Sequence, residues 1–197
     1  MRIVFLGPPG VGKGTQGSRL AAHLKAAHIS TGDMLRHEVE QATDIGKKVS
    51  STLAAGELVS DELIIELVNS RLGKVDALDR FLLDGFPRTI HQAEALDTFL
   101  GSRNQDVTAA ILLVADKEEI LRRLMARARA QGRSDDSPET VVQRLEIYHR
   151  QTEPLVGYYE QTGKLHRVDG VGTIGEVFDR LLLVLERATS ARESTSS

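Results

Sequence analysis

Nine residues near the N-terminus, GPPGVGKGT at positions 7–15, constrain the fold more than any other part of the sequence. They follow the apolar run RIVFL (residues 2–6) and precede a segment with helical spacing. Ordering four glycines costs much backbone entropy, so such a cluster indicates a specific use. A strand, a glycine-rich loop with a lysine, and a helix together are typical of a loop whose backbone N–H groups surround phosphates.

The end of this loop departs from the general phosphate-binding pattern. Gly14 follows Lys13, and the hydroxyl side chain arrives one residue later, as Thr15. We expect Lys13 to reach a transferred phosphate as a mobile point charge. A glycine-rich turn that only connects a strand to a helix stays open as the alternative.

Apolar runs of strand length alternate with amphipathic segments of helix length. The expected strands are 2–6, 27–30, 81–84, 109–114 and 164–168, and the expected helices are 12–27, 61–75, 91–102, 116–128, 137–162 and 173–187. This alternation predicts an α/β fold, in which helices cover both faces of a parallel sheet. Within 137–162, Ser137 and Pro138 suit a helix start, whereas Pro154 predicts a kink or an interruption.

Three segments do not follow this alternation. Residues 30–59 contain helical patterns without a strand, and residues 128–136 form a polar loop between two helices. Each is expected to be an insertion at the edge where parallel sheets bind ligands. The tail 188–197 consists largely of small and polar residues, so we expect it to be disordered.

Length and composition narrow the class of protein. A chain of 197 residues suits one domain, and its formal net charge of −3 argues against a dedicated nucleic-acid binder. The absence of cysteine excludes disulfides and a thiolate zinc site. We find no signal segment and no apolar run long enough to span a bilayer, so the expectation is a soluble cytoplasmic protein without membrane contact.

Several arginines are placed where they could meet phosphate groups at that edge. Arginine suits this task because its planar fork of donors matches a phosphate. The candidates are Arg36 in the first insertion, Arg88 just past an expected strand, Arg123 and Arg127 on one helix face, Arg133 in the polar loop and Arg144 on the next helix. For any one of them a surface charge is the alternative. Arg122 and Arg129 point away from the Arg123 face, and a solvated role is expected for both.

One aspartate marks a candidate magnesium position. Asp84 ends an apolar strand, where phosphate-binding loop proteins hold Mg²⁺, often through water. A helix cap or an ion pair with an arginine is the alternative. Asp33 suits a helix cap as well as a metal. The histidines show no ligand spacing, and His23, His28 and His37 are interpreted as structural or solvated.

Five motifs, in order along the chain, resemble the adenylate kinase family. They are GPPGVGKGTQ, HISTGDMLR, LLDGFPRTIHQAEAL, GRSDDSPETVVQRLEIYHRQTEPLVGYY and VDGVGTIGEVF. In that family Gly14 and Thr15 are the usual end of the loop. The resemblance implies a three-layer P-loop kinase fold with a five-stranded parallel sheet. It implies a core (residues 1–29, 60–127 and 137–187), a helical AMP-binding insertion (30–59) and a lid of the short type (128–136), which holds no zinc.

The resemblance also implies roles for individual residues. On the ATP side these are Gly10, Val11, Gly12, Lys13, Gly14 and Thr15 around the phosphates, Arg123 stacked on adenine, Arg127 on the phosphates, and the Gly172 carbonyl on the adenine amino group. On the AMP side they are Thr31, Arg36, the backbone of Glu57, Leu58 and Val59, then Gly85, Phe86, Pro87 and Arg88, with Gln92 on the adenine edge. Arg133 and Arg144 would clamp phosphates of both nucleotides. Lys13, Arg88, Arg123, Arg133 and Arg144 form the implied catalytic set.

The implied reaction is reversible transfer of the γ-phosphoryl group from Mg-ATP to AMP, giving two ADP and balancing adenine nucleotides. Such transfer needs no side-chain nucleophile, because it depends on aligning phosphates, neutralising their charge and excluding water. Family practice favours a monomer. A UMP or CMP kinase is the nearest alternative, although Gln92 and Thr31 favour adenine. A GTP-dependent switch protein is a further one, but the guanine-reading run NKxD is absent.

Overall fold

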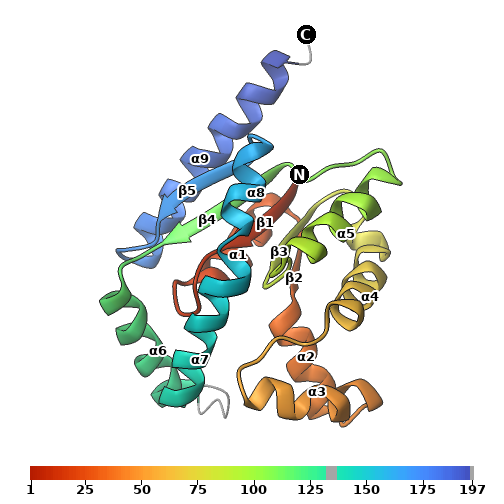
Figure 1. The fold of residues 1–197 in the computed structure, drawn as a ribbon. Coiled ribbons are helices and arrows are strands. Elements are labelled where there is room, and N and C mark those ends of the chain that lie inside the picture. Colours follow the sequence, from red (N-terminus) through yellow and green to blue (C-terminus); the bar gives the residue numbers. More distant parts are fainter. Residues whose placement is uncertain (132–136, 196–197) are drawn as a thin grey trace.

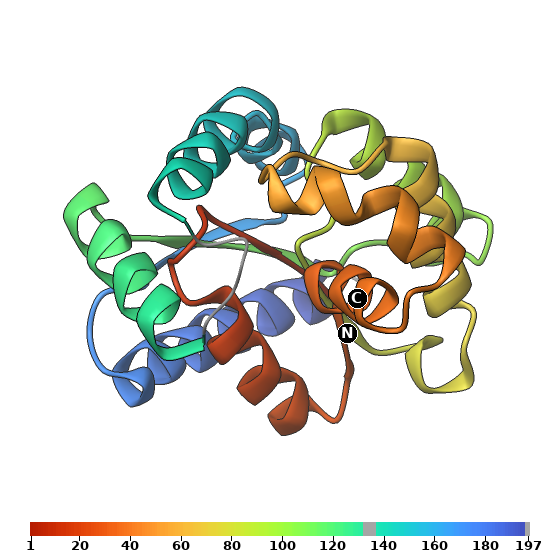
Figure 2. The same cartoon turned by 90° about the horizontal axis from the view of Figure 1, so that it is seen from below.

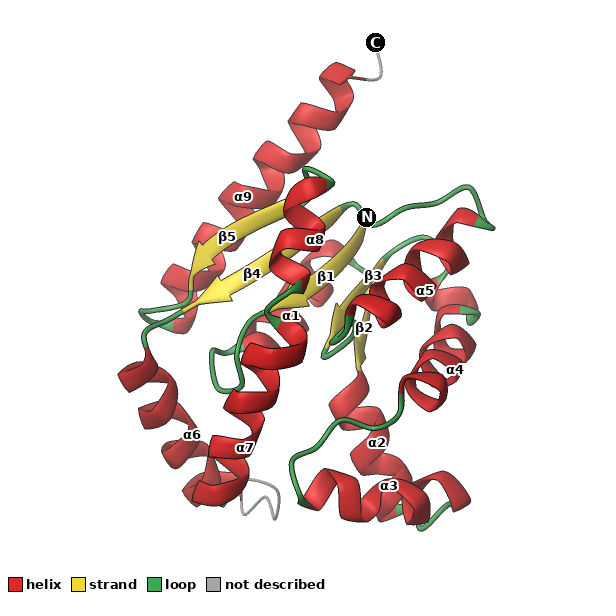
Figure 3. Cartoon of the chain, in the orientation of Figure 1, coloured by secondary structure: helices red, strands yellow, loops and turns green. Residues whose placement is uncertain are grey.

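The computed structural model describes residues 1–131 and 137–195 and contains a five-stranded parallel sheet (Figures 1 and 3). The strands are β1 (Arg2–Leu6), β2 (Ala27–Ser30), β3 (Phe81–Asp84), β4 (Ala109–Val114) and β5 (Leu165–Asp169), in the spatial order β2-β3-β1-β4-β5. The five predicted strands are confirmed, with β5 shifted by one residue. The chain crosses to opposite sides of β1 to build this order, and a ligand crevice is expected outside the carboxyl ends of strands at such a point.

Helices cover both faces of the sheet and give three layers (Figure 2). Helices α1 (Lys13–Leu24) and α9 (Ile174–Thr195) pack on one face, whereas α4 (Asp61–Leu72), α5 (Ile90–Gly101) and α8 (Leu155–Gln161) pack on the other. A short 3₁₀ turn, η1 (Val75–Ala77), lies between α4 and β3. The predicted α/β class is therefore confirmed.

Alternate residues of the central strand belong to different cores. Ile3 and Phe5 pack in the core beneath α1 and α9, and Val4 and Leu6 pack in the core beneath α4, α5 and α8. Because side chains alternate across a strand and both faces are covered, every one of these positions must be apolar. This explains why the inner strands β1, β3 and β4 are nearly continuous apolar runs, whereas the edge strands β2 (AHIS) and β5 (LHRVD) are less buried and contain polar residues.

The remaining helices lie beyond the carboxyl ends of the strands (Figure 1). They are α2 (Thr31–Glu40), α3 (Asp44–Ala54), α6 (Lys117–Gln131) and α7 (Pro138–Ile147). Ser30 begins α2 by accepting a hydrogen bond from the Asp33 backbone N–H, and Thr43 begins α3 in the same way through Gly46. Apart from Ser30, which ends β2, segment 30–59 contains two helices and no strand, in agreement with the sequence prediction.

The predicted helix 137–162 consists of three pieces. Ser137 accepts from the Thr140 N–H and begins α7, as predicted. A π-helical turn, η2 (Tyr148–Thr152), follows, and α8 begins just after Pro154. The interruption occurs there because proline has no N–H to donate to the preceding turn.

Two boundaries differ from the sequence prediction. Helix α6 continues to Gln131, into the segment expected to be a polar loop, and residues 132–136 lie outside the described part of the chain. Helix α9 continues to Thr195, although a disordered tail was expected over 188–197. The tail contains alanine, arginine and glutamate, which favour helix, so its small and polar composition was a misleading signal. Within the described residues, no helix is both long enough and apolar enough to cross a membrane.

Candidate functional site

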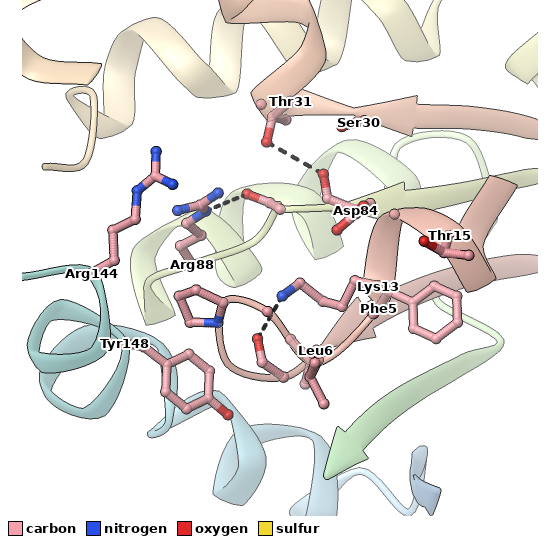
Figure 4. Close-up of a pocket in the computed structure, with 18 of the residues that line it drawn as sticks. Phe5, Leu6, Lys13, Thr15, Ser30, Thr31, Asp84, Arg88, Arg144 and Tyr148 are labelled. Carbon is pink, nitrogen blue, oxygen red and sulfur yellow. Dashed lines mark hydrogen bonds between the residues drawn. The ribbon is translucent and has the colours of Figure 1, made fainter. Parts of the chain in front are cut away.

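A cleft of about 940 Å³ opens beyond the carboxyl ends of the strands, between the glycine loop (residues 7–15) and helices α2, α6 and α7. Figure 4 shows part of its lining. Most residues singled out in the sequence line this one cleft. They are Gly10, Val11, Gly12, Lys13, Gly14, Thr15, Thr31, Arg36, Glu57, Leu58, Val59, Asp84, Gly85, Pro87, Arg88, Gln92, Arg123, Arg144 and Gly172.

Among the described residues, one predicted site residue, Phe86, is not part of this lining, and two others, Arg127 and Arg133, cannot be placed. The side chain of Phe86 is 1% exposed and packs in the core beneath α5, so only its backbone could face a ligand. Arg127 belongs to α6, but its side chain is outside what the structure describes, and so is all of Arg133. Their roles stay predictions.

The glycine loop is shaped by close backbone approach. Gly7 has a φ of 137°, and a Cβ there would lie 2.6 Å from the carbonyl oxygen of Leu113 on β4, so a larger residue does not fit. The loop also holds the ammonium group of Lys13, whose Nζ donates to the carbonyl oxygens of Gly7 at 2.8 Å and Pro8 at 3.0 Å (Figure 4). The lysine is therefore fixed within the curve of the loop.

Arg123 is held in place by acceptors from three segments. Its Nε donates to Glu119 Oε1 at 2.6 Å, its Nη1 to the Val11 carbonyl at 2.9 Å, and its Nη2 to the Gly170 carbonyl at 2.9 Å. These contacts lie in the plane of the guanidinium group, which leaves its flat faces suited to stacking. Arg123 thus connects α6 to both the glycine loop and the turn after β5.

Glu119 is a supporting residue that the sequence reasoning missed. Its hydrogen bonds with Arg122, and then with Arg123, lower its pKa from 4.5 to about 2. Glutamate four residues before arginine is a known helical pair, so the spacing was an available signal. Arg122 itself is 69% exposed and forms two bonds to Glu119 at 2.7 Å, although it borders the cleft.

On the other side of the cleft, positive charges gather. The Nε of Arg88 donates to the Gly85 carbonyl at 2.9 Å. Burial lowers the pKa of Arg88, nearby Asp84 opposes this, and the positive charges of Arg144 and Arg36 lower the pKa further. Figure 4 shows Arg88 and Arg144 directed toward the same space. Mutual repulsion of guanidinium groups in one cleft would be relieved by an anion such as phosphate.

The end of β3 supports this charged region. Gly85 has a φ of 83°, and a Cβ there would lie 2.8 Å from Thr31 Oγ1, so the turn brings β3 and α2 close together. Thr31 Oγ1 donates to the Asp84 carbonyl at 3.4 Å (Figure 4), and the peptide bond between Phe86 and Pro87 is cis. Asp84 is 8% exposed, and its Oδ2 lies 3.7 Å from the position that a Cβ on Gly14 would occupy. Its carboxylate therefore faces the start of α1.

Gln92 is bound to protein groups at both ends of its amide. Its Oε1 accepts from the Arg88 backbone N–H at 2.7 Å, and its Nε2 donates to Asp61 Oδ1 at 2.7 Å. Burial raises the pKa of Asp61, but donors from Gln92, Thr89 and His91 lower it more, so the net pKa is below its usual value. The sequence reasoning missed Asp61, because a contact across 31 residues leaves no local pattern.

An acidic side chain, Asp33, and an aromatic side chain, Tyr148, also line the cleft. Asp33 lies in the first turn of α2 and accepts from Arg36 Nη2 at 2.5 Å. Tyr148, from the π-helical turn, also lines the cleft and was not singled out in the sequence. Burial, together with Glu153, raises its pKa to about 12, so it stays a neutral hydroxyl at physiological pH.

Comparison with known proteins identifies the family. The family model described as adenylate kinase matches residues 5–164 of this chain. The chain belongs to the adenylate kinase family. An adenylate kinase from Xanthomonas campestris is 47% identical over 187 residues, covering 95% of this chain and 100% of that protein. An adenylate kinase from Thermus thermophilus is 49% identical over 183 residues, covering 93% and 96%, and one from Xanthomonas oryzae is 46% identical over 187 residues, covering 95% and 100%. The five-stranded parallel sheet with helices on both faces agrees with the P-loop kinase fold of adenylate kinases.

Proposed function

We propose that this protein is an adenylate kinase that transfers the γ-phosphoryl group of ATP to AMP, reversibly, to give two ADP. The observation that carries the proposal is that one cleft holds both the glycine loop with Lys13 and the guanidinium groups of Arg36, Arg88 and Arg144. Phosphoryl transfer between two nucleotides needs this combination, because the charge of two phosphate chains must be neutralised at the point where they meet.

The ATP side of the proposal rests on the glycine loop and Arg123. Residues 10–15 would surround the phosphates with backbone N–H groups at the start of α1, where the helix terminus favours negative charge. Arg123 would stack on the adenine ring, and its hydrogen bonds support this because they occupy the edge of the guanidinium group and not its faces. The Gly172 carbonyl would accept from the adenine amino group.

The AMP side rests on residues 84–92 and the insertion. Arg88 and Arg36 would bind the AMP phosphate, with Arg144 between the two phosphate chains. Thr31 and the backbone of residues 57–59 and 85–87 would hold the nucleoside, and Gln92 would read the adenine edge. All of the side chains named here border the same cleft, which supports the assignment.

We propose that Mg²⁺ enters with ATP and that Asp84 helps to hold it through water. Among the described residues, no group of three or more His, Cys, Asp and Glu side chains forms a protein cage for a metal. Mg²⁺ instead suits one or two carboxylates together with substrate phosphates, and the Asp84 carboxylate facing the start of α1 offers that donor set. When bound, the ion supplies charge neutralisation on the phosphate oxygens.

Three parts of the proposal come from the sequence and its resemblance to the family. They are the division into core, AMP-binding insertion (30–59) and short lid (128–136), the monomeric state, and the cytoplasmic location. Closure of a lid would exclude water, which otherwise competes with AMP for the phosphoryl group. Arg133, in the lid, would meet the phosphates of both nucleotides.

A coupled assay of ADP formation tests the proposal. ATP is supplied with AMP, UMP, CMP or GMP in turn, and kcat/KM for AMP is expected to exceed the others by about a hundredfold or more. A preference for UMP or CMP would make the protein a pyrimidine monophosphate kinase. Hydrolysis of GTP without any monophosphate acceptor would instead indicate a switch protein.

A further inference from the structure

The amide of Gln92 is held in one orientation by two partners of opposite kind. The backbone N–H of Arg88 can only donate, and it lies 2.7 Å from one end of the amide. The carboxylate of Asp61 accepts at the other end, also at 2.7 Å. Only one orientation, with Oε1 toward Arg88 and Nε2 toward Asp61, satisfies both partners. Gln92 is 2% exposed, so a flipped amide would have no water to compensate it.

Asp61 is itself positioned by α5. It is the first residue of α4, and its Oδ2 accepts from the hydroxyl of Thr89 at 2.8 Å, while His91 Nδ1 lies 3.2 Å away. Thr89 also begins α5 by accepting from the Gln92 N–H at 3.2 Å. The lowered pKa of Asp61 keeps it ionised at neutral pH, so it offers only acceptors to Gln92.

A fixed amide can distinguish two classes of purine. Beyond its bonds to Arg88 and Asp61, a glutamine amide has a second N–H and a second lone pair, and Gln92 borders the cleft. A 6-aminopurine offers a donor at N6 and an acceptor at N1, whereas a 6-oxopurine offers an acceptor at O6 and a donor at N1. The two patterns are reversed, so an amide fits one class in one orientation and the other class when flipped.

We propose that Asp61 is a positioning residue that fixes the orientation of the Gln92 amide and thereby selects a 6-aminopurine monophosphate over a 6-oxopurine monophosphate. The inference rests on the proposed function, including the role of Gln92 at the base. Asp61 does not touch the base in this account. It acts by making the flipped amide costly, because the flipped amide would place a carbonyl oxygen against a carboxylate.

The test compares AMP with inosine monophosphate, which carries a 6-oxo group and a protonated N1 in place of the 6-amino group and N1 acceptor. In Asp61→Ala, kcat/KM for AMP is expected to fall about tenfold, mainly through KM, while that for inosine monophosphate does not fall. The ratio of kcat/KM for AMP to kcat/KM for inosine monophosphate is therefore expected to decrease by about tenfold or more. Asp61→Asn keeps an oxygen that can accept from Gln92 and is expected to recover most of the discrimination.

Glu62→Ala is the matched control. Glu62 is the next residue in the first turn of α4, carries the same charge and is exposed. Its removal takes the same charge from the start of the helix but leaves Gln92 untouched, so the AMP to inosine monophosphate ratio should stay at the wild-type value. An unchanged ratio in Asp61→Ala, or an equal change in Glu62→Ala, would overturn the proposal.

Failure of this inference and failure of the proposed function give different results. Wild-type protein that does not phosphorylate AMP contradicts the function itself. Wild-type activity on AMP with the same AMP to inosine monophosphate ratio in Gln92→Ala removes Gln92 from the base site and overturns the inference, but it leaves the proposed reaction standing. Should Asp61→Ala not fold, a neutron structure of the wild-type protein decides: two deuterons are expected on the amide atom facing Asp61, and an atom without deuterons there would overturn the proposal.

Discussion

The glycine loop and the α5 corner (residues 84–92) line the same cleft but are held in shape by different contacts. The glycine loop depends mainly on the backbone geometry of nine consecutive residues, and the close approach of Gly7 to the Leu113 carbonyl on β4 adds a constraint from outside the motif. The α5 corner depends on side chains that come from distant parts of the sequence, such as Asp61 on Gln92 and Thr31 on Asp84. A contiguous motif thus shapes the glycine loop, to which Arg123 adds one long-range side-chain contact, whereas long-range side-chain contacts predominate in the α5 corner.

This difference has a functional meaning under the proposed function. Triphosphate groups are the same in every nucleotide, so a backbone cradle recognises them without reading a base. The acceptor must be distinguished from other monophosphates, and fixed polar side chains provide such selectivity. We therefore expect changes in the glycine loop to abolish the chemistry and changes in the α5 corner to alter substrate preference.

The largest effect is expected from Lys13→Ala. Removing the ammonium group that would stabilise charge on the transferred phosphoryl group should lower kcat by about a thousandfold or more. The fold should remain intact, because the Lys13 ammonium group binds the Gly7 and Pro8 carbonyls of its own loop and is not part of either core. Steady-state kinetics measures the fall in kcat, and circular dichroism checks that the fold is intact. Activity within about tenfold of wild type would remove Lys13 from the catalytic set.

Gly7→Ala should damage the loop through its backbone. The positive φ and the 2.6 Å approach to the Leu113 carbonyl predict a loss of about 2 to 4 kcal/mol in the free energy of unfolding. Gly157→Ala is the control, because Gly157 lies inside α8 and a Cβ there meets nothing within 4 Å. It should stabilise by about 0.5–1 kcal/mol. Denaturant unfolding measures the free energy of unfolding of both variants. An equal change in Gly7→Ala and Gly157→Ala would show that a side chain at Gly7 does not strain the loop.

Arg88→Lys tests the α5 corner. A lysine keeps the charge but loses the planar fork, so KM for AMP should rise about tenfold or more while KM for ATP changes little. Measuring each KM at saturating concentration of the other nucleotide separates the two sides. Similar increases in KM for AMP and KM for ATP would mean that Arg88 does not belong to a separate AMP side of the cleft.

A smaller effect is expected from Glu119→Gln, which weakens the support of Arg123 on the ATP side. KM for ATP should rise by about two- to fivefold with KM for AMP unchanged. The Glu119 pKa is lowered from 4.5 to about 2, so its contacts contribute fully above pH 4.5 and are lost as the pH falls through about 2. NMR titration of the Glu119 carboxyl checks this directly, and a midpoint near 4.5 would contradict the paired geometry.

The sequence predicted the parts of the molecule that are encoded locally. Nearly continuous apolar runs identified the inner strands, since both faces of the sheet are buried there, and the pattern around Lys13 identified the loop. The roles of Arg123 and Gln92 came from the resemblance rather than from spacing. Asp61 was missed because its partner Gln92 is 31 residues away and no periodicity connects the two.

Helix ends were predicted less well than helix positions. Helix α9 was expected to end at residue 187 but extends to Thr195, because a polar segment with good helix formers can continue an existing helix. The π-helical turn Tyr148–Thr152, which brings Tyr148 to the cleft, had no signal in the sequence apart from the nearby Pro154.

The most direct test of the central claim is the product balance of the reaction, followed by ³¹P NMR with ATP, Mg²⁺ and AMP. The account predicts that each AMP consumed removes one ATP and yields two ADP, that no ADP forms without AMP, and that ADP alone returns ATP and AMP. Formation of ADP together with inorganic phosphate in the absence of AMP would contradict it, because water rather than AMP would then be the acceptor.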